Sequence, residues 1–402
     1  MKVLMLGWEL PPHNSGGLGV ACMHMCKALS SAGADIHFIV PYTADHSSID
    51  FMRVSSAVPV NVKEVQKAGL AYDSFKFIDE NGREEWVSLF DYHRLYEKSM
   101  DNIVTLGEFD VIHAHDWLTM RAGMRAKQIS GKPLIVHIHA TEFDRSGGNR
   151  GNPMVEEIEY MGMMMADKII AVSQLTKDVI ISHYGIPAEK IEVVHNSIDT
   201  GIYDDVIGKN AYPLLEKMRA HGYKVVMNVG RLTLQKGLYN LMNAMKLVIE
   251  KRPKTFMVFM GNGEQELELL EMAADLGIGS NVLFTGFQRG KNWRDMFAQS
   301  DLFVMPSISE PFGLTALESA AFGVATLVSK QSGVAEVMRS ALTVDYWDIN
   351  EMANQICAVL DNQALQDQLS DDGLNEVQQM SWQHGAKKMM HIYAQQHQEA
   401  YA

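Results

Sequence analysis

The sequence predicts an α/β protein built from two consecutive doubly wound domains. Short apolar runs alternate with segments of helical period along most of the 402 residues. A glycine-rich loop follows the first strand of the chain, and the alternation of strand, loop and helix begins again near residue 224. This pattern is typical of parallel sheets whose crossover helices cover both faces.

The first half begins with a buried strand at residues 3–6, a loop at 14–19, a helix from about 20 to 31 and a strand at 36–40. Further continuous apolar runs predict strands at residues 111–113, 134–137, 168–172 and 191–194. Residues 51–100 alternate differently, which predicts a small antiparallel insertion with Asn81-Gly82 as its hairpin turn.

The second half has apolar runs that predict strands at residues 224–230, 255–260, 281–286, 302–305 and 325–328, and a helix from about 237 to 251. The polar stretch 196–205 lacks periodicity and marks a linker, with the join near residues 197–215. We therefore divide the chain into residues 1–200, together with a final helix at about 383–402, and residues 201–382. Two such sheets predict a ligand cleft between the domains, at the carboxyl ends of the strands.

Composition and charge exclude several classes of protein. Hydrophobic residues make up 47% and charged residues 21%, which excludes disorder of the whole chain. The net charge of −14 argues against nonspecific nucleic-acid binding. No apolar run approaches the roughly 20 residues that span a bilayer, so we expect a cytoplasmic protein, with peripheral membrane contact left open. Cys22 and Cys26 lie four apart in a helical pattern, which favours packed thiols over metal ligands.

The strongest candidate site lies in residues 309–318. Pro311 and Gly313 keep Glu310 on a loop, and a helix begins near Leu314. The free N–H groups of a helix start attract anions. Glu318 could accept two hydroxyl hydrogen bonds, as from a ribose, and Glu310 could accept sugar hydroxyls. The alternative is a pair of ordinary solvated carboxylates.

Two other loops hold candidate binding groups. Arg231 and Lys236 follow a strand and precede a helix, where their charges could neutralise a diphosphate. The glycine spacing there is not that of a P-loop. Gly16 and Gly17 let the backbone approach a phosphate or a sugar closely, although a packing turn explains them equally well.

Histidines cluster at the ends of two predicted strands: His113 and His115 on one, His137 and His139 on the next. Two His-X-His pairs raise the possibility of zinc, since alternation points His137 and His139 to the same face. Both segments end at the expected cleft, where contact with a sugar is the interpretation we favour, so we predict no metal site. No Gly-X-Ser-X-Gly sequence supports a serine hydrolase.

Taken together, these motifs resemble the GT-B glycosyltransferases of family 4 and the related glycogen and starch synthases. The resemblance spans nearly the whole chain and rests on residues 11–19, 113–117 and 139–145, on Gly230-Arg231 with Lys236-Gly237, and on the Glu310 to Glu318 element. It implies a GT-B fold of two Rossmann-like domains facing across a cleft, with a C-terminal helix that crosses back to the first domain.

The resemblance also implies a role for each motif residue. Arg231 and Lys236 would bind the donor diphosphate, Glu318 the nucleotide ribose, and His139 would lie near the reacting carbon. Gly16 and Gly17 would touch the donor from the first domain. The donor sugar and phosphate would be held by Glu310 and the backbone of Phe312, Gly313, Leu314 and Thr315. The catalytic set is thus His139, Arg231, Lys236 and Glu310.

The sequence departs from the family pattern at two places. His195 stands where the family usually has proline. Asn14-Ser15 occupies the region where bacterial glycogen synthases commonly have lysine, which weakens the assignment of ADP-glucose. Trp117, after His-Ala-His-Asp, favours the relatives that make α-glucans.

The function implied is retaining transfer of a hexose, glucose first, from a nucleoside diphosphate sugar to a glycan such as an α-glucan. UDP-glucose or ADP-glucose would be the donor, with no metal and no other cofactor. Three alternatives stay open. They are a mannosyl- or glucosyltransferase of cell-envelope polysaccharide or small-molecule glycoside synthesis, a non-catalytic carbohydrate-binding protein of the same fold, and a GT-B epimerase.

Overall fold

The computed structural model describes residues 1–13, 16–58, 75–78, 84–202 and 212–400. The chain forms two compact units. Unit 1 comprises Met1–Phe143, Arg150–Ser197 and Trp382–Ala402, and unit 2 comprises Asp144–Asn149 and Ile198–Ser381. The division made from the sequence placed residues 144–149 in the first domain, whereas the structure groups them with unit 2.

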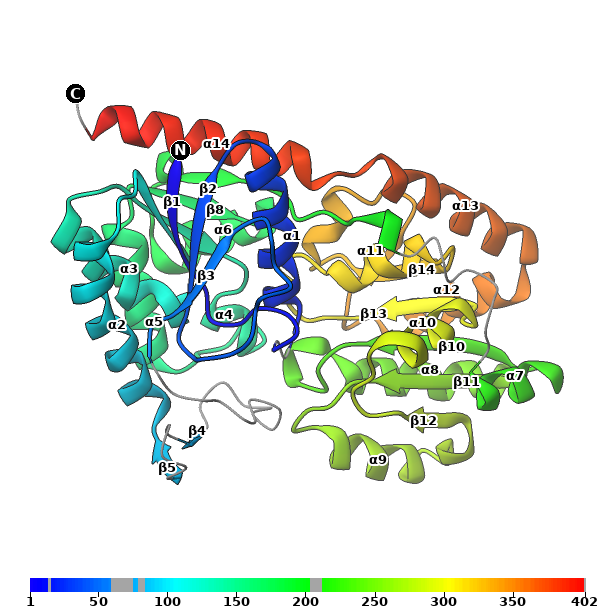
Figure 1. Ribbon diagram of the computed structural model, residues 1–402. Helices are drawn as coiled ribbons and strands as arrows, with labels where there is room; N and C mark the ends of the chain where they lie inside the picture. The colour runs from blue at the N-terminus through cyan, green and yellow to red at the C-terminus, as the bar shows by residue number, and fades with distance from the viewer. Residues whose placement is uncertain (14–15, 59–74, 79–83, 203–211, 401–402) are drawn as a thin grey trace. The chain divides into compact units, whose positions relative to one another are not determined.

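Unit 1 is built on a seven-stranded sheet with the order β3-β2-β1-β6-β7-β8-β9, and every pairing is parallel (Figure 1). Its strands are β1 Lys2–Leu6, β2 Asp35–Val40, β3 Arg53–Ser56, β6 Val111–His115, β7 Leu134–Ile138, β8 Lys168–Ala171 and β9 Ile191–Val193. Its helices are α1 Gly17–Ser31, α2 Leu89–Leu106, α3 Trp117–Ser130, α5 Pro153–Met165, α6 Gln174–Tyr184 and α14 Trp382–Glu399.

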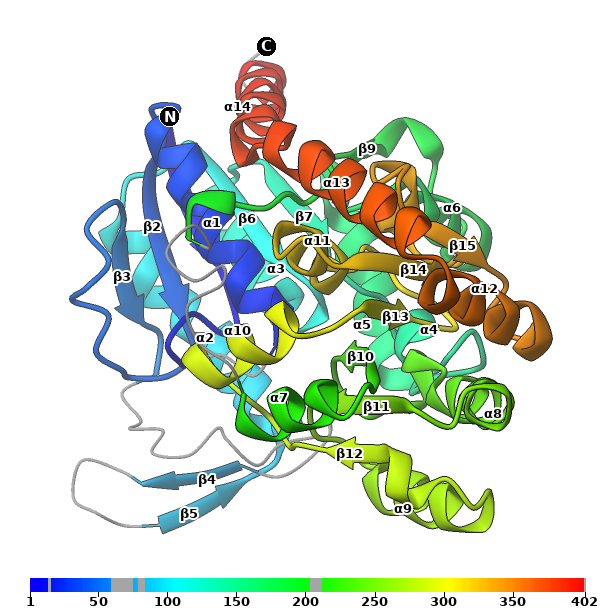
Figure 2. The same ribbon diagram turned by 90° about the vertical axis from the view of Figure 1, so that its right-hand side faces the viewer.

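Helices cover both faces of this sheet. Successive side chains of a strand point to opposite faces, so each strand contributes residues to both layers. Ile112 and Ala114 of β6 join a core with α2, α3, α5 and α6. His113 and His115 point to the opposite face, which α1 and α14 cover (Figure 2). One face of β6 is therefore apolar, whereas the other presents two histidines beside Val111.

The C-terminal helix α14 packs within unit 1, as predicted from the family resemblance. It lies beside α1 and contacts β6. The Tyr393 hydroxyl bonds to His113 Nδ1 at 2.5 Å, and Lys388 forms an ion pair with Glu192 at 3.0 Å. Helix α14 is thus bonded to the central strand β6 and to the edge strand β9 of this sheet.

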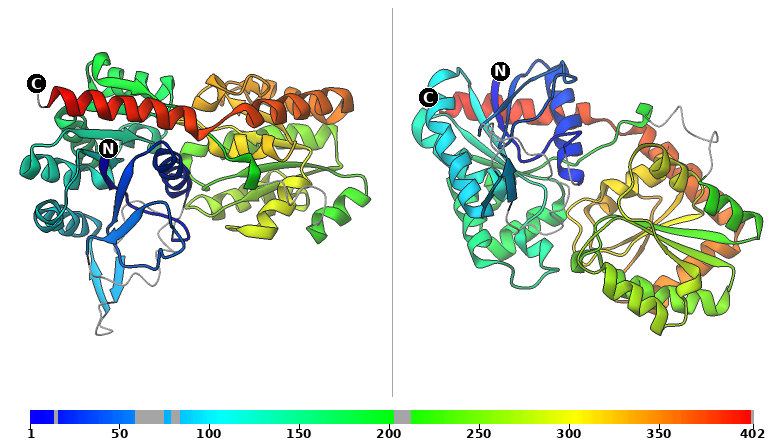
Figure 3. Two further views of the ribbon diagram at one scale, coloured as in Figure 1. Left: turned by 45° about the horizontal axis from the view of Figure 1, so that its top comes forward. Right: turned by 60° about the horizontal axis from the view of Figure 1, so that its bottom comes forward.

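Unit 2 has a six-stranded parallel sheet with the order β12-β11-β10-β13-β14-β15. Its strands are β10 Lys224–Val229, β11 Thr255–Met260, β12 Val282–Phe284, β13 Leu302–Met305, β14 Ala325–Ser329 and β15 Leu342–Val344. Its helices are α7 Pro213–Ala220, α8 Leu238–Lys251, α9 Glu266–Asp275, α10 Gly290–Ala298, α11 Leu314–Ala321, α12 Ile349–Asp361 and α13 Gln363–Gln379. One face packs against α8, α9 and α12, and helices also cover the other face (Figure 3). The predicted fold class is confirmed.

Residues 51–100 differ in part from the prediction. β4 Phe75–Ile78 and β5 Glu84–Val87 do form an antiparallel pair. The predicted turn at Asn81-Gly82 lies outside the described residues. β3 instead joins the main sheet in parallel, and α2 begins at Leu89, where the sequence analysis expected no helix. Ser88 caps this helix by accepting a hydrogen bond from the backbone N–H of Asp91.

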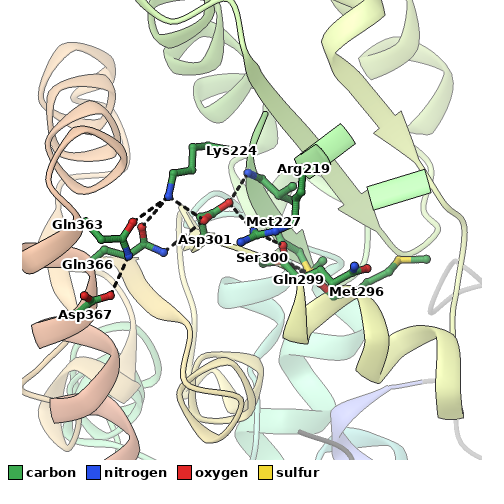
Figure 4. Close-up of polar contacts among 11 residues, drawn as sticks. Arg219, Lys224, Met227, Met296, Gln299, Ser300, Asp301, Gln363, Gln366 and Asp367 are labelled. Atoms are coloured by element: carbon green, nitrogen blue, oxygen red, sulfur yellow. Dashed lines mark hydrogen bonds and ion pairs between the residues drawn. The ribbon is translucent and has the colours of Figure 1, made fainter. Parts of the chain in front are cut away.

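A polar network closes the amino-terminal edge of the unit 2 sheet, just before β13 and at the start of β10 (Figure 4). The carboxylate of Asp301, 2% exposed, accepts hydrogen bonds from Arg219 Nη1 at 2.8 Å, Lys224 Nζ at 3.2 Å and the Val225 N–H at 2.7 Å. Burial of this charge is compensated by its donors. Among the described helices, none is both long and apolar enough to cross a bilayer.

Candidate functional site

The opposite, carboxyl-terminal edge of the unit 2 sheet brings together the loops after β10 and β13. These strands are neighbours in a parallel sheet, so their following loops leave the same edge side by side. The Ile308 N–H donates to the Gln235 carbonyl at 2.8 Å, and Gln235 Nε2 donates to the Ser309 carbonyl at 2.9 Å. The sequence-predicted Lys236 and Glu310 thereby meet, with Lys236 Nζ 2.5 Å from Glu310 Oε2.

Glu310 is only 8% exposed, and both its carboxylate and its backbone are hydrogen-bonded. Its Oε2 also accepts a hydrogen bond from Ser307 Oγ at 2.9 Å. Its backbone N–H donates to the Gln331 carbonyl, and its carbonyl accepts from the Gly333 N–H, both at 2.9 Å. The carboxylate and the ammonium group of Lys236 are therefore fixed in place where little water screens their charges.

Two glycines permit the close approach of these loops. Gly237 has φ +64°, and a Cβ there would lie 2.2 Å from the Pro306 carbonyl oxygen. Gly313 has φ +105° and precedes α11, so the helix begins at Leu314 as predicted. The first N–H groups of α11, around Thr315, form a positive end of a helix dipole next to the Glu310 loop.

Glu318 lies in the second turn of α11 and is partly exposed. Burial raises the pKa of its carboxyl group to about 8. The group is therefore mostly protonated at neutral pH and could both donate and accept hydrogen bonds. Arg231, directly after Gly230 at the end of β10, is exposed. The predicted residues of unit 2 thus lie at one sheet edge, on two adjacent loops and in the first two turns of α11: Arg231, Lys236, Glu310, Phe312, Gly313, Leu314, Thr315 and Glu318.

The predicted residues of unit 1 lie at the carboxyl edge of its own sheet. Gly16 caps the N-terminus of α1 and Gly17 is its first residue, while residues 14–15 lie outside the described part of the chain. His139 follows β7; burial lowers its pKa to about 3, so its ring is neutral at neutral pH. Its Nε2 lies 3.0 Å from His115 Nδ1.

Two aspartates with clear structural roles were not singled out from the sequence. Asp116 has φ 56°, alone among the described non-glycine residues in having a positive φ. Its Oδ1 accepts the His139 N–H at 2.6 Å, so this strained residue fixes the backbone next to the candidate histidine. Asp144 Oδ1 accepts a hydrogen bond from Ser309 Oγ at 2.5 Å within unit 2. The sequence analysis included both residues only as members of longer motifs.

Comparison with known proteins assigns the chain to a family. The family model Glycosyltransferase Family 4 matches residues 15–201, and the model Glycosyl transferases group 1 matches residues 216–376. The chain is a GT-B glycosyltransferase of family 4. The resemblance stated from the sequence motifs is confirmed.

Relatives of this glycosyltransferase extend over most of its length. An uncharacterized glycosyltransferase of Methanocaldococcus jannaschii is 28% identical over 98% of both chains. A glycogen synthase of Mycobacterium tuberculosis is 28% identical and covers 90% of this chain and 87% of its own. A D-inositol 3-phosphate glycosyltransferase of Gordonia bronchialis is 26% identical, with 95% and 84% covered.

Solved structures show the same fold for the glycosyltransferase. Sucrose-phosphate synthase from Thermosynechococcus elongatus has a TM-score of 0.76 at 18% identity, with 98% of each chain covered. Anabaena HepE in complex with UDP and glucose has a TM-score of 0.72 at 19% identity, with 98% of this chain and 100% of the other covered.

Proposed function

We propose that this glycosyltransferase moves glucose from UDP-glucose or ADP-glucose to a glycan acceptor, with retention of the α-configuration. The observation that carries the proposal is the fixed contact between Lys236 and Glu310 beside the N-terminus of α11. A cation, a carboxylate and a helix start within adjacent loops suit a ligand that joins a sugar to a phosphate. The glycogen synthase relative and the UDP and glucose complex of a structural neighbour support this choice.

In this proposal Lys236, Arg231 and the N-terminus of α11 bind the donor diphosphate. Negative charge grows on the leaving phosphate as the bond to the sugar breaks, and fixed donors stabilise that charge most where water is excluded. Lys236 is already held by Glu310 and needs little reorganisation. The positive groups would perform the role that a divalent cation has in other transferases, so the proposed reaction needs no metal.

The two carboxyl groups would hold the neutral parts of the donor. Glu310, with the backbone from Phe312 to Thr315, would accept hydroxyl protons of the sugar, and Glu318 would bind the ribose. Ser307 and Lys236 both bond to the same oxygen of Glu310, which leaves the other oxygen for a sugar hydroxyl. The resulting orientation fixes C1 of the sugar.

Unit 1 would contribute Gly16, Gly17 and His139 to the reacting end of the donor. His139 cannot act as a cation at neutral pH because burial holds its pKa at about 3, so its role would be to orient the donor sugar. The acceptor hydroxyl would attack C1 on the face that the phosphate leaves. Its proton would pass to the departing phosphate oxygen as the new C1–O bond forms.

A second acceptor class has its own support. The D-inositol 3-phosphate glycosyltransferase relative indicates that a small phosphorylated polyol is an alternative to a glycan.

A non-catalytic carbohydrate-binding role is the third candidate, and the presence of Arg231, Lys236, Glu310 and Glu318 argues against it. Since nucleotide sugars are made in the cytoplasm, we place the reaction there.

The test is release of nucleoside diphosphate from a panel of UDP-, ADP- and GDP-sugars, with and without maltooligosaccharide or inositol phosphate. We expect release from a glucose donor, stimulated by maltooligosaccharide, and a loss of roughly 100-fold in kcat for Lys236→Ala. Lys246→Ala, which breaks a solvent-facing pair with Glu250, is the matched control. Release without stimulation by the oligosaccharide but with inositol phosphate would favour the second candidate, and equal rates for both lysine variants would contradict the site.

A further inference from the structure

Four imidazole rings stack on one face of the unit 1 sheet, between β6 and β7. His115 and His137 are direct partners in the parallel register. His113 lies two residues before His115 in β6, and His139 lies two residues after His137, just beyond the end of β7. Ring centroids lie 4.4 Å apart for His113 and His115, 5.3 Å for His115 and His137, and 4.3 Å for His137 and His139. One ring nitrogen from each of His113, His115 and His137 lies within 4.8 Å of the other two.

Outer hydrogen bonds orient two of these rings. His113 Nδ1 bonds to the Tyr393 hydroxyl at 2.5 Å, and His115 Nδ1 lies 3.0 Å from His139 Nε2. If each Nδ1 carries the proton, both Nε2 atoms have a lone pair that can bind a metal ion. A histidine that binds a metal commonly has its other ring nitrogen held in this way.

Several ring nitrogens of this histidine cluster lack the hydrogen-bond partners that burial normally requires. His113 is 0% exposed and His137 is 1% exposed, yet His113 Nε2 and both nitrogens of His137 have no hydrogen-bond partner among the described residues. His115 Nε2 contacts Met5 Sδ at 3.0 Å, and when the His115 proton is on Nδ1 this contact is not a hydrogen bond. Buried polar atoms without partners are costly and uncommon, so their occurrence on two neighbouring rings of one cluster is the observation that points to a ligand.

We propose that His113, His115 and His137 bind one transition-metal ion, with Zn²⁺ as its probe. Zn–N bonds of about 2.1 Å in a tetrahedral site place ligand nitrogens about 3.4 Å apart. From nitrogens within 4.8 Å of one another, the rings would turn out of their stacked arrangement to converge on the ion. Met5 Sδ beside His115 and the buried thiol of Cys22, which groups with His115 and His139, add soft donors. Such a set suits Zn²⁺ or Cu⁺ rather than Mg²⁺ or Ca²⁺.

This ion would have a structural role, distinct from the proposed transfer reaction. Tyr393 comes from α14, so its bond to His113 would connect the ion to the docking of the C-terminal helix. His139 is a neighbour of the ligand cluster, and a bound ion would fix the ring of His115 to which His139 bonds.

The test uses the full chain, dialysed against a chelator and titrated with Zn²⁺ and, separately, with Co²⁺. We expect one equivalent bound per chain, a rise in Tm of about 5 °C or more at a 100-fold excess over Kd, and the strong visible absorption of low-coordinate Co²⁺. His137→Gln should weaken binding at least 100-fold. Tyr393→Phe, which leaves all three ligands in place, should weaken it about 10- to 100-fold.

His93→Gln is the matched control, because His93 is another buried histidine of unit 1, and its ring nitrogens have no hydrogen-bond partner among the described residues. It should bind Zn²⁺ as the wild type does. Uptake of Cu⁺ in place of Zn²⁺ would still support the site and would identify a softer ion. Absence of stoichiometric binding by the wild type, or only the weak spectrum of octahedral Co²⁺, would overturn the proposal even if His137→Gln fails to fold. Neither readout depends on sugar transfer.

Discussion

Replacing Gly237 by alanine tests whether the close approach of the two unit 2 loops creates the donor site. Gly237 has φ +64°, where an L side chain costs roughly 1–2 kcal/mol. Its Cβ would also lie 2.2 Å from the Pro306 carbonyl oxygen, a backbone atom that no rotamer change can move away. The two loops must therefore separate until this distance exceeds 3.0 Å.

Those loops bear Lys236 and Glu310, so their separation changes the geometry that we assign to donor binding. A misplacement of about 1 Å costs about 100-fold in rate. We therefore expect Gly237→Ala to lower kcat/KM for nucleoside diphosphate release about 100-fold. The cost in unfolding free energy should exceed the roughly 1–2 kcal/mol of backbone strain alone.

Gly277→Ala is the matched control. Gly277 also lies in unit 2 and has φ +71°, but nothing lies within 4 Å of its Cβ position. It should show the backbone strain without the loop displacement, and its kcat/KM should stay within about twofold of the wild type. Urea unfolding and initial-rate assays measure both effects. Equal losses of stability and of rate in the two variants would refute the reasoning.

Three further predictions concern other parts of the chain. Asp301→Asn should lower the unfolding free energy by about 2–3 kcal/mol, because Arg219 and Lys224 lose a buried partner but are themselves partly solvated. The variant should keep the kcat of the wild type. A stable but inactive variant would contradict the structural role of Asp301. Burial lowers the pKa of His93 to about 3 from 6.5, so the unfolded state takes up the proton first as pH falls below 6.5, and stability falls with it. Urea unfolding should show the wild type losing about 1.4 kcal/mol more than His93→Gln between pH 7.5 and 5.5, and parallel pH profiles would argue against a neutral buried ring. Since burial raises the pKa of Glu318 to about 8, calorimetric UDP affinity of the wild type should rise up to about eightfold from pH 7 to 8.5 as the carboxylate forms, while Glu318→Gln should stay flat.

Local sequence signals were enough to place the loops of unit 2. Pro311 and Gly313 prevent a helix before Leu314, and α11 begins there. The same reasoning failed at α2, because Leu89 and Phe90 at the start of this helix follow closely on the apolar residues Trp86 and Val87 of β5. The decisive signal was the cap at Ser88 with Asp91 three residues later.

Contacts between distant residues were beyond local reasoning. Alternation along β7 indicated that His137 and His139 share a face, and their stacked rings agree with it. Nothing local to β6 indicated that Tyr393, 280 residues away, would bond to His113. The grouping of Asp144 with Ser309 is likewise a contact across 165 residues. Such pairs depend on how whole elements pack, which neither periodicity nor spacing encodes.

The central claim, transfer of glucose with retention, is tested most directly by analysis of the product. The full-length protein is incubated with UDP-glucose or ADP-glucose and a maltooligosaccharide, and the new linkage is read by proton NMR of the anomeric region. We predict one new α-linked glucose for each nucleoside diphosphate released. A β-linked product, or no transfer from any donor to any of the acceptors, would contradict the account.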